Sequence, residues 1–101
     1  MAARKQWQVK CKIQKGMFEN EYLVAIDVLG DQGELGQATA FADKDDLTAD
    51  VFPTTGEPVA GWLAVSPLQI GRSSARIVLP KPTMANGAIV MVPTSNLATP
   101  T

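Results

Sequence analysis

Histidine is absent from this 101-residue chain, and cysteine occurs once, at Cys11. Without histidine, the Ser–His and Cys–His pairs that activate nucleophiles in many enzymes cannot form. One cysteine and no histidine also provide too few ligands for a structural zinc site. A single cysteine forms no disulfide within the chain, so the cysteine content does not indicate an oxidising compartment. We therefore expect no conventional enzyme active site and no cofactor.

Charged residues are also scarce. They make up 19% of the chain, whereas hydrophobic residues make up 46%, and a typical globular protein has about 25% charged residues. No apolar run approaches the roughly 18–20 residues that span a bilayer, and residues 1–6 lack the apolar segment of a signal peptide. We therefore expect a cytoplasmic protein with no membrane partner. Interface centres are depleted in charge, so a protein partner or a homo-oligomer is also expected.

What the sequence does contain is strict alternation of polar and apolar residues. Residues 6–13 place Trp7, Val9, Cys11 and Ile13 on one face and Gln8, Lys10 and Lys12 on the other, as in a half-buried strand. Weaker forms of the same pattern predict five more strands, and no stretch longer than one turn has a helical period. The additional predicted strands are residues 22–28, 37–42, 59–65, 75–79 and 88–92.

Six short strands separated by turn residues predict an all-β fold. We expect a small six-stranded, partly closed antiparallel barrel, SH3-like or similar, with a β-sandwich as the alternative. The length suits a single domain, which we place at residues 1–93, followed by a loose tail at residues 94–101. The expected core consists of Trp7, Val9, Cys11, Ile13, Val24, Ile26, Phe41, Trp62, Val65, Ile77, Leu79, Ile89 and Met91.

Glycine and proline mark the connections between the predicted strands. Residues 30–36 include three glycines and predict a turn. The pair Asn86–Gly87 predicts a tight hairpin, because both residues tolerate positive φ. Pro80 and Pro82 have no N–H to donate to a ladder, so their strand is expected to fray or to lie at an edge.

Four aspartates lie close together in the longest irregular stretch. Asp43, Asp45, Asp46 and Asp50 offer oxygen ligands that a hard cation such as Ca²⁺ accepts. Their spacing differs from an EF-hand loop, which needs a glycine and a terminal glutamate that are missing. A solvated turn explains the same residues, with one helical turn over residues 45–50 and Asp45 or Asp46 as its N-cap.

Charge is unevenly distributed along the chain. The first 15 residues contain five basic residues and no acidic one, residues 19–57 contain all ten carboxylates and one lysine, and residues 58–101 contain three basic residues. A basic strand paired with an acidic strand would cancel these charges locally. The alternative is two separate patches of opposite charge, which favour head-to-tail self-association or an asymmetric partner.

Nucleic acid is not expected as a partner. The basic strand contains Trp7, and single-strand binders combine basic grooves with stacking aromatic residues. Trp7, however, lies on the face opposite Lys10 and Lys12. The net charge of −1 and the isoelectric point near 5.2 also lack the electrostatic footprint of a nucleic-acid binder.

The favoured hypothesis is a non-catalytic interaction or assembly module that associates with itself. Its candidate interaction residues are Phe18, Tyr22, Phe52 and Trp62, which lie near turns or strand ends, together with Lys10 and Lys12. One alternative is a β-barrel that binds a small molecule, with its mouth near Phe52 and Trp62. A further alternative is a carboxylate-based hydrolase or isomerase that uses the acidic middle segment.

Overall fold

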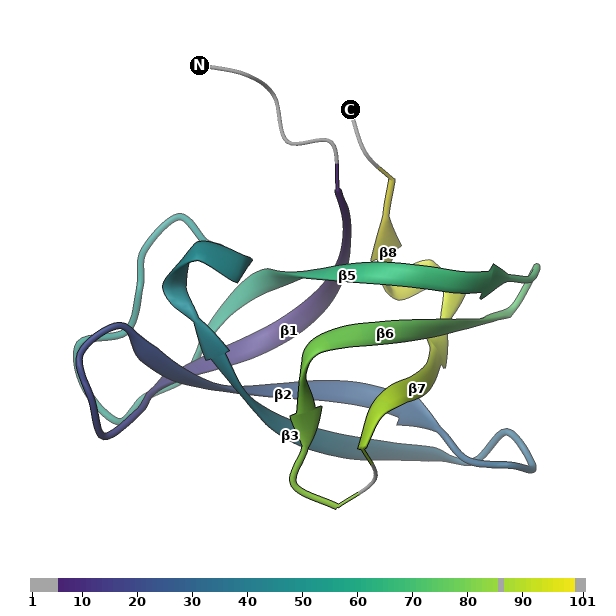
Figure 1. The fold of residues 1–101 in the computed structure, drawn as a ribbon, viewed down its shortest axis with the longest axis horizontal. Coiled ribbons are helices and arrows are strands. Elements are labelled where there is room, and N and C mark those ends of the chain that lie inside the picture. The colour runs from purple at the N-terminus through teal and green to yellow at the C-terminus, as the bar shows by residue number, and fades with distance from the viewer. Residues whose placement is uncertain (1–5, 86, 100–101) are drawn as a thin grey trace.

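A single antiparallel sheet, bent round on itself, makes up nearly all of the molecule (Figure 1). The computed structural model describes residues 6–85 and 87–99. Within these residues the only helical segments are two 3₁₀ turns, η1 (Lys44–Asp46) and η2 (Thr94–Asn96). The strands are β1 (Trp7–Lys15), β2 (Glu21–Leu29), β3 (Leu35–Asp43), β4 (Leu47–Thr48), β5 (Val59–Ile70), β6 (Ser74–Thr83), β7 (Gly87–Pro93) and β8 (Leu97–Ala98).

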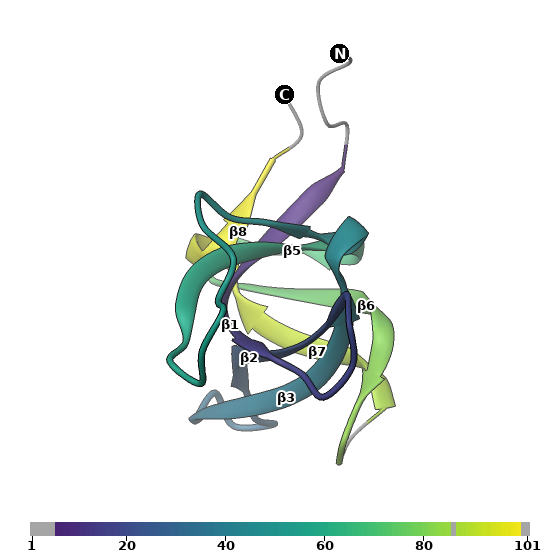
Figure 2. The same ribbon diagram turned by 90° about the vertical axis from the view of Figure 1, so that its left-hand side faces the viewer.

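The sheet closes into a small barrel. Its hydrogen-bonded order is β4-β5-β1-β2-β3-β6-β7, and an additional pairing of β5 with β6 completes the ring. Figure 2 shows these strands surrounding a common interior. The all-β class and the small antiparallel barrel predicted from the sequence are confirmed. The ring has five strands, β1, β2, β3, β6 and β5, with the other strands attached to it, rather than six.

Strand β1 follows its sequence pattern. Val9 and Ile13 are fully buried and Cys11 nearly so, whereas Lys10 and Lys12 are exposed. The strand pairs with β5 over most of its length, with β2 over its second half and with β8 at Gln8 and Val9. Burying one Val, Leu or Ile side chain contributes about 1.5–3 kcal/mol, so this one strand makes a large contribution to the core.

Strands β3 and β7 bury the face that the sequence analysis placed outside, and on β5 the two expected core residues, Trp62 and Val65, lie on opposite faces. On β3, Phe41 is 39% exposed, and Ala38, Ala40 and Ala42 point inward instead. The sequence analysis assigned the large Phe41 ring to the core, but Phe41 shares its face with the exposed polar residues Gln37 and Thr39. The physical reason is the register with β2, which places Ala40 beside the buried Val24 on the inner face. The alanines fit there because the barrel interior is narrow.

Strands β5 and β7 also differ from expectation, although Val65 of β5 is buried as predicted. Leu63 lies opposite Val9 inside the barrel, so its neighbour Trp62 is on the outer wall and only half-buried. On β7, Val90 and Val92 are buried, whereas Ile89 is 54% exposed and Met91 is half-buried. Trp7 is also half-buried, and it packs against the edge of the core. The most deeply buried large side chains are Ile13, Ile26, Leu63, Ile77, Val9, Val24 and Val92.

The helical turn predicted over residues 45–50 is shorter than expected and starts earlier. The 3₁₀ turn η1 begins one residue earlier, with Asp43 rather than Asp45 or Asp46 at its N-cap, and Asp43 makes no capping hydrogen bond there. Leu47 then pairs with Leu63 as part of β4 and is buried. Burial of Leu47 therefore limits the helical segment to a single turn.

The strand with the two prolines is irregular, as predicted. The β6–β7 register shifts between Val78 and Thr83, and β6 pairs with β3 at a single position, Ala40 with Thr83. At the end of this hairpin Gly87 has φ +77°, and its carbonyl accepts a 2.8 Å hydrogen bond from the Thr83 hydroxyl. Asn86, the other half of the predicted turn pair, lies outside the described residues.

The segment expected to be a loose tail is in part ordered. Leu97 and Ala98 form β8, which pairs with Val9 and Gln8 of β1. Leu97 is half-buried against the core. Burial of this one apolar side chain explains why the chain continues along the barrel after Pro93.

Gly61 is expected to be intolerant of any side chain. A Cβ at this position would lie 2.9 Å from the carbonyl oxygen of Thr48 and would also collide with the side chain of Ile13. Because overpacking a core costs about 1–3 kcal/mol, we predict that Gly61→Ala lowers the free energy of unfolding by that amount. Urea denaturation measures it. Gly56→Ala is the control, since nothing lies within 4 Å of its Cβ position; equal losses in both variants would contradict the prediction.

Candidate functional site

One end of the barrel gathers most of the acidic residues. The β1–β2 turn, η1 and the loop of residues 49–58 meet there, on the side that faces the viewer in Figure 2. Gln14 donates a 3.0 Å hydrogen bond to the carbonyl of Gly56, and the backbone N–H of Lys44 donates to the carbonyl of Asn20 at 3.2 Å. We call this surface the acidic end. Its carboxylates are Glu19, Glu21, Asp43, Asp45, Asp46, Asp50 and Glu57, and its lysines are Lys15, Lys44 and Lys81.

Two of the predicted interaction residues hold the acidic end together. The rings of Tyr22 and Phe52 pack with their centroids 5.4 Å apart. Lys15 lies over the Tyr22 ring at 5.5 Å, and Lys44 lies over the Phe52 ring at 5.1 Å. Such cation–π contacts contribute about 0.5–1 kcal/mol each at exposed sites. Tyr22 is buried and Phe52 half-buried, so the structure places both beneath the surface, where they anchor the loop.

Phe18, by contrast, is an exposed apolar tip. It is 68% exposed in the β1–β2 turn, next to Met17 at 90%, and Val51 on the neighbouring loop is 69% exposed. The turn is fixed by a hydrogen bond from the Glu21 N–H to the Phe18 carbonyl and by Asn20, which adopts φ 64°. The acidic end therefore presents three apolar side chains from ordered loops. Sequence analysis identified Phe18 but missed Met17 and Val51.

The remaining predicted interaction residues lie together on the barrel wall. Lys10 on β1 is directly opposite Trp62 on β5, and Lys12 is opposite Ala60. We call Lys10, Lys12 and Trp62 the basic strip. The sequence analysis missed this cluster because it assigned Trp62, the aromatic residue opposite Lys10, to the core.

Neither lysine of the basic strip forms an ion pair with a described residue. In residues 6–85 and 87–99 the one salt bridge joins Lys81 Nζ to Asp43 Oδ1 at 3.1 Å. Asp27 of β2 lines the same shallow cleft of about 160 Å³ as Lys10 and Lys12, without a salt bridge to either. The basic strand is thus not neutralised by close pairing with its acidic neighbour, and most carboxylates lie instead at the acidic end.

The four aspartates proposed as a cation site do not come together. Asp43 is engaged by Lys81, and across the described part of the chain no three or more His, Cys, Asp or Glu side chains are grouped so that they could hold a metal ion. Asp45, Asp46 and Asp50 are distributed along η1 and the following loop. The carboxylate-based hydrolase or isomerase gains no support from this arrangement and stays a prediction.

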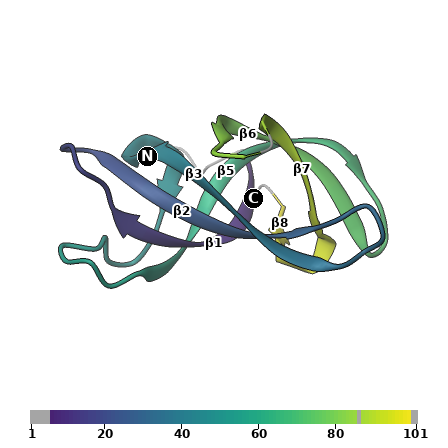
Figure 3. The same cartoon turned by 90° about the horizontal axis from the view of Figure 1, so that it is seen from below.

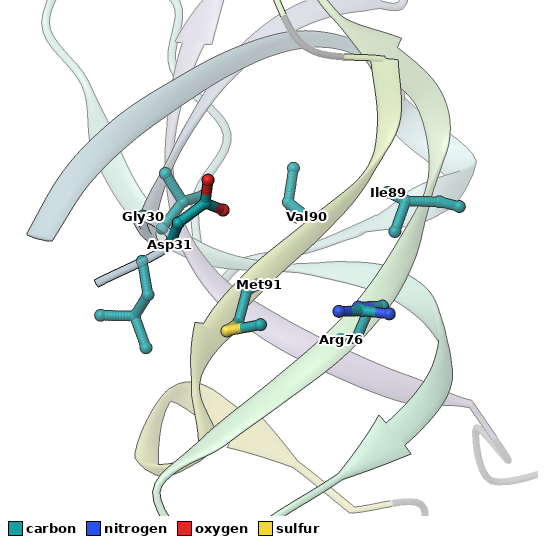
Figure 4. Close-up of a pocket in the computed structure, with 8 residues that line it drawn as sticks. Gly30, Asp31, Arg76, Ile89, Val90 and Met91 are labelled. Carbon is teal, nitrogen blue, oxygen red and sulfur yellow. The ribbon is translucent and has the colours of Figure 1, made fainter. Parts of the chain in front are cut away.

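The two residues expected at the mouth of a small-molecule site lie on different parts of the barrel, and this alternative stays a prediction. Phe52 packs on Tyr22 at the end of the barrel, whereas Trp62 lies on the outer wall beside Lys10. Of five surface clefts among the described residues, with volumes of about 120–400 Å³, none is lined by Phe52 or Trp62. The largest of these, about 400 Å³, lies elsewhere, between the end of β2 and strand β7 (Figure 4).

No protein-family model, curated protein or solved structure matches this chain. Among the residues that the structure describes, no helix has the length and apolar character needed to cross a membrane. Any function must therefore be argued from the surfaces of the barrel itself.

Cys11 is expected to be inert in the folded protein. Burial raises the pKa of its thiol from 9.0 to about 12. Because the unfolded thiol ionises near pH 9 and the folded one does not, the free energy of unfolding should fall as the pH rises from 9 towards 12, and the contribution of this thiol should be fully retained below pH 9. Urea denaturation across this range should show a steeper decline for the native sequence than for Cys11→Ala. Equal slopes, or rapid labelling of the native thiol at pH 8, would contradict this.

Proposed function

We propose that this protein is a non-catalytic assembly module that associates with copies of itself. The acidic end of one copy docks on the basic strip of the next. The observation that supports this most directly is the division of charge on the described surface. Seven carboxylates surround exposed apolar tips at one end, whereas Lys10, opposite Trp62 on the wall, and the neighbouring Lys12 form no ion pair with any described residue.

Apolar and charged groups both contribute to the binding energy in this arrangement. Met17 and Phe18 lose most of their exposed surface when they dock, at about 25 cal/mol per Å² of apolar area. Trp62 provides a half-exposed aromatic partner for Phe18, and tryptophan is among the residue types most enriched in binding hot spots. The charges orient the two copies and speed their encounter, and the attraction between the two lysines and the carboxylates makes part of the affinity sensitive to salt.

A contact between two different surfaces is heterologous. Such contacts build rings when the rotation closes and filaments when it does not. The rigid turn at Phe18 and the paired strands β1 and β5 hold both surfaces in place without binding, so little conformational entropy is lost on association. An extended assembly, rather than a simple dimer, is the expected product.

Salt should dissociate this assembly. The mean mass measured by light scattering after size exclusion should rise with protein concentration at low ionic strength and fall as salt screens the charges. Lys10→Glu should weaken association by about tenfold or more, since it places like charge against the acidic end. Arg72→Glu makes the same charge change on the β5–β6 hairpin and should have little effect. A mass that is monomeric at all concentrations, or equal losses in both variants, would refute the proposal.

The apolar tip is tested separately. Phe18→Ser should weaken association by about 2 kcal/mol, which is about 30-fold, because truncation of a central apolar anchor has a cost of this size. Leu68→Ser is the matched control, since Leu68 is 56% exposed on the β5–β6 hairpin, against 68% for Phe18. Sedimentation velocity measures both variants. Wild-type association by Phe18→Ser would exclude the acidic end as the docking surface.

A further inference from the structure

Strand β7 is the longest free edge of the sheet among the described strands. It is the last strand in the hydrogen-bonded order, and over residues 87–93 it pairs only with β6. The strand at the opposite end of the order, β4, has two residues, and so has β8. Short edges and charged edges protect a sheet from pairing with another chain. Strand β7 has seven residues and no charged side chain, so it lacks both protections.

The register shows which backbone groups occupy this edge. In an antiparallel ladder, residues alternate between pointing their N–H and C=O groups at the partner strand and pointing them away. The N–H of Thr94 donates to the carbonyl of Ser73 at 3.1 Å, which fixes the phase of the alternation along β6 and β7. Counting back from this pair in steps of two residues, the N–H and C=O groups of Val92 and Val90 point towards β6. The N–H and C=O groups of Met91 and Ile89 therefore point to the free edge.

A cleft lies along the same edge. Its volume is about 400 Å³, and Ile89, Val90 and Met91 form one side of it. The end of β2, from Val28 to Asp31, forms the other side without pairing with β7. Figure 3 shows the β2–β3 hairpin extending past β7, and Figure 4 shows the side chains of the cleft. The end of β2 approaches β7 closely on this side without pairing with it, and the cleft lies between the two strands, with Ile89 54% exposed beside it.

We propose that β7 pairs with β7 of a second copy across a two-fold axis, which joins the two barrels edge to edge. An antiparallel pairing centred on Val90 places Ile89 of each copy opposite Met91 of the other. Both residues present their N–H and C=O groups to the edge, so the two pairs form backbone hydrogen bonds in both directions. The exposed Ile89 and half-buried Met91 then pack as cross-strand neighbours. Pro93, which has no N–H, ends the pairing.

The charges at the cleft make a second copy the fitting occupant. Asp31 lies on the β2 side and Arg76 on the β6 side, where Arg76 is the cross-strand neighbour of Met91. In the paired arrangement the strand order is β6-β7-β7-β6. The Arg76 of each copy therefore approaches the Asp31 side of the other, and the two-fold axis repeats this contact. A surface that complements itself is what an isologous interface requires.

Edge pairing uses residues different from those of the proposed contact between the acidic end and the basic strip. We call the latter the head-to-side contact. Edge pairing therefore extends the assembly rather than replacing that contact. Edge pairing alone gives a dimer held by backbone hydrogen bonds and apolar side chains, which salt weakens little. The head-to-side contact alone gives larger species that dissociate at high salt. Sedimentation velocity at low and high salt therefore separates the two, and a dimer that persists in high salt is the result expected from edge pairing.

The sharpest test exchanges the two charges between copies. Each variant, Asp31→Arg or Arg76→Asp, should form the edge-paired dimer more weakly than the native sequence when it is studied alone at moderate salt. In such a dimer, residues 31 and 76 of opposite copies carry the same charge, and the two-fold axis repeats this repulsion. An equimolar mixture of the two variants should form heterodimers. In these the arginine introduced by the first substitution meets the aspartate introduced by the second, and the native Asp31 of one copy meets the native Arg76 of the other. Native mass spectrometry distinguishes the heterodimer by mass. If Asp31 and Arg76 act only within one copy, the equimolar mixture should show no excess of heterodimer over homodimers. That result would overturn the proposal.

The edge itself is tested by a charge. Ile89→Lys should abolish the dimer at high salt, since a lysine on an edge strand prevents strand addition. Leu68→Lys adds the same charge at another exposed aliphatic side chain and should leave the dimer intact. Circular dichroism and urea denaturation confirm that each variant is folded. A dimer that survives Ile89→Lys refutes edge pairing, and a monomer in high salt for the native sequence does so as well. If Phe18→Ser loses the larger, salt-sensitive species but keeps the dimer, the first result supports the head-to-side contact and the second supports edge pairing.

Discussion

Closure of the barrel depends on the pairing of β1 with strands on both of its edges. Strand β5 lies along one edge, while β2 and β8 share the other, so the backbone of β1 is satisfied nearly from end to end. Its alternation assigns Val9, Cys11 and Ile13 to the interior and its lysines to the outer wall. Because a shift by one residue would exchange the two faces, β1 also sets the register of its neighbours. The inward position of Leu63 and the outward position of Trp62 follow directly.

This dependence explains which strands were predictable from sequence. In β1 one face is polar, so period-two alternation identified the inner side chains without knowledge of the partners. In β5 and β7 both faces are apolar, and the pattern is compatible with either choice. In β3 the large Phe41 ring shares one face with the polar Gln37 and Thr39, while the other face has small alanines, so side-chain size and polarity indicate opposite faces. There the inner face is decided by cross-strand register, such as Leu63 opposite Val9 and Ala40 opposite Val24. That information is held by residues far apart in the chain, and a single strand does not contain it.

The candidate surfaces were predictable to a similar extent. The sequence identified Phe18, Lys10 and Lys12 as surface candidates, since exposure follows from a turn or from a polar strand face. It misplaced Trp62, and with it the adjacency of an aromatic ring to Lys10. The role of Tyr22 and Phe52 as internal supports also depended on a long-range contact, that between β2 and the loop of residues 49–58.

The free edge of β7 results from the same prolines that make β6 irregular. A barrel normally removes free edges, because each strand finds a neighbour on both sides. Strand β6 pairs with β7 up to Val78, passes through Pro80 and Pro82, and at Thr83 pairs both with Gly87 of β7 and with Ala40 of β3. The ring therefore closes through β3, as the bend of β6 in Figure 1 shows, and among the described strands β7 is left outside it with one edge unpaired. The closure of the ring through β3 and the free edge of β7 both follow from the bend of β6 at Pro80 and Pro82. An additional strand at β7 satisfies the backbone that this route of closure leaves unpaired.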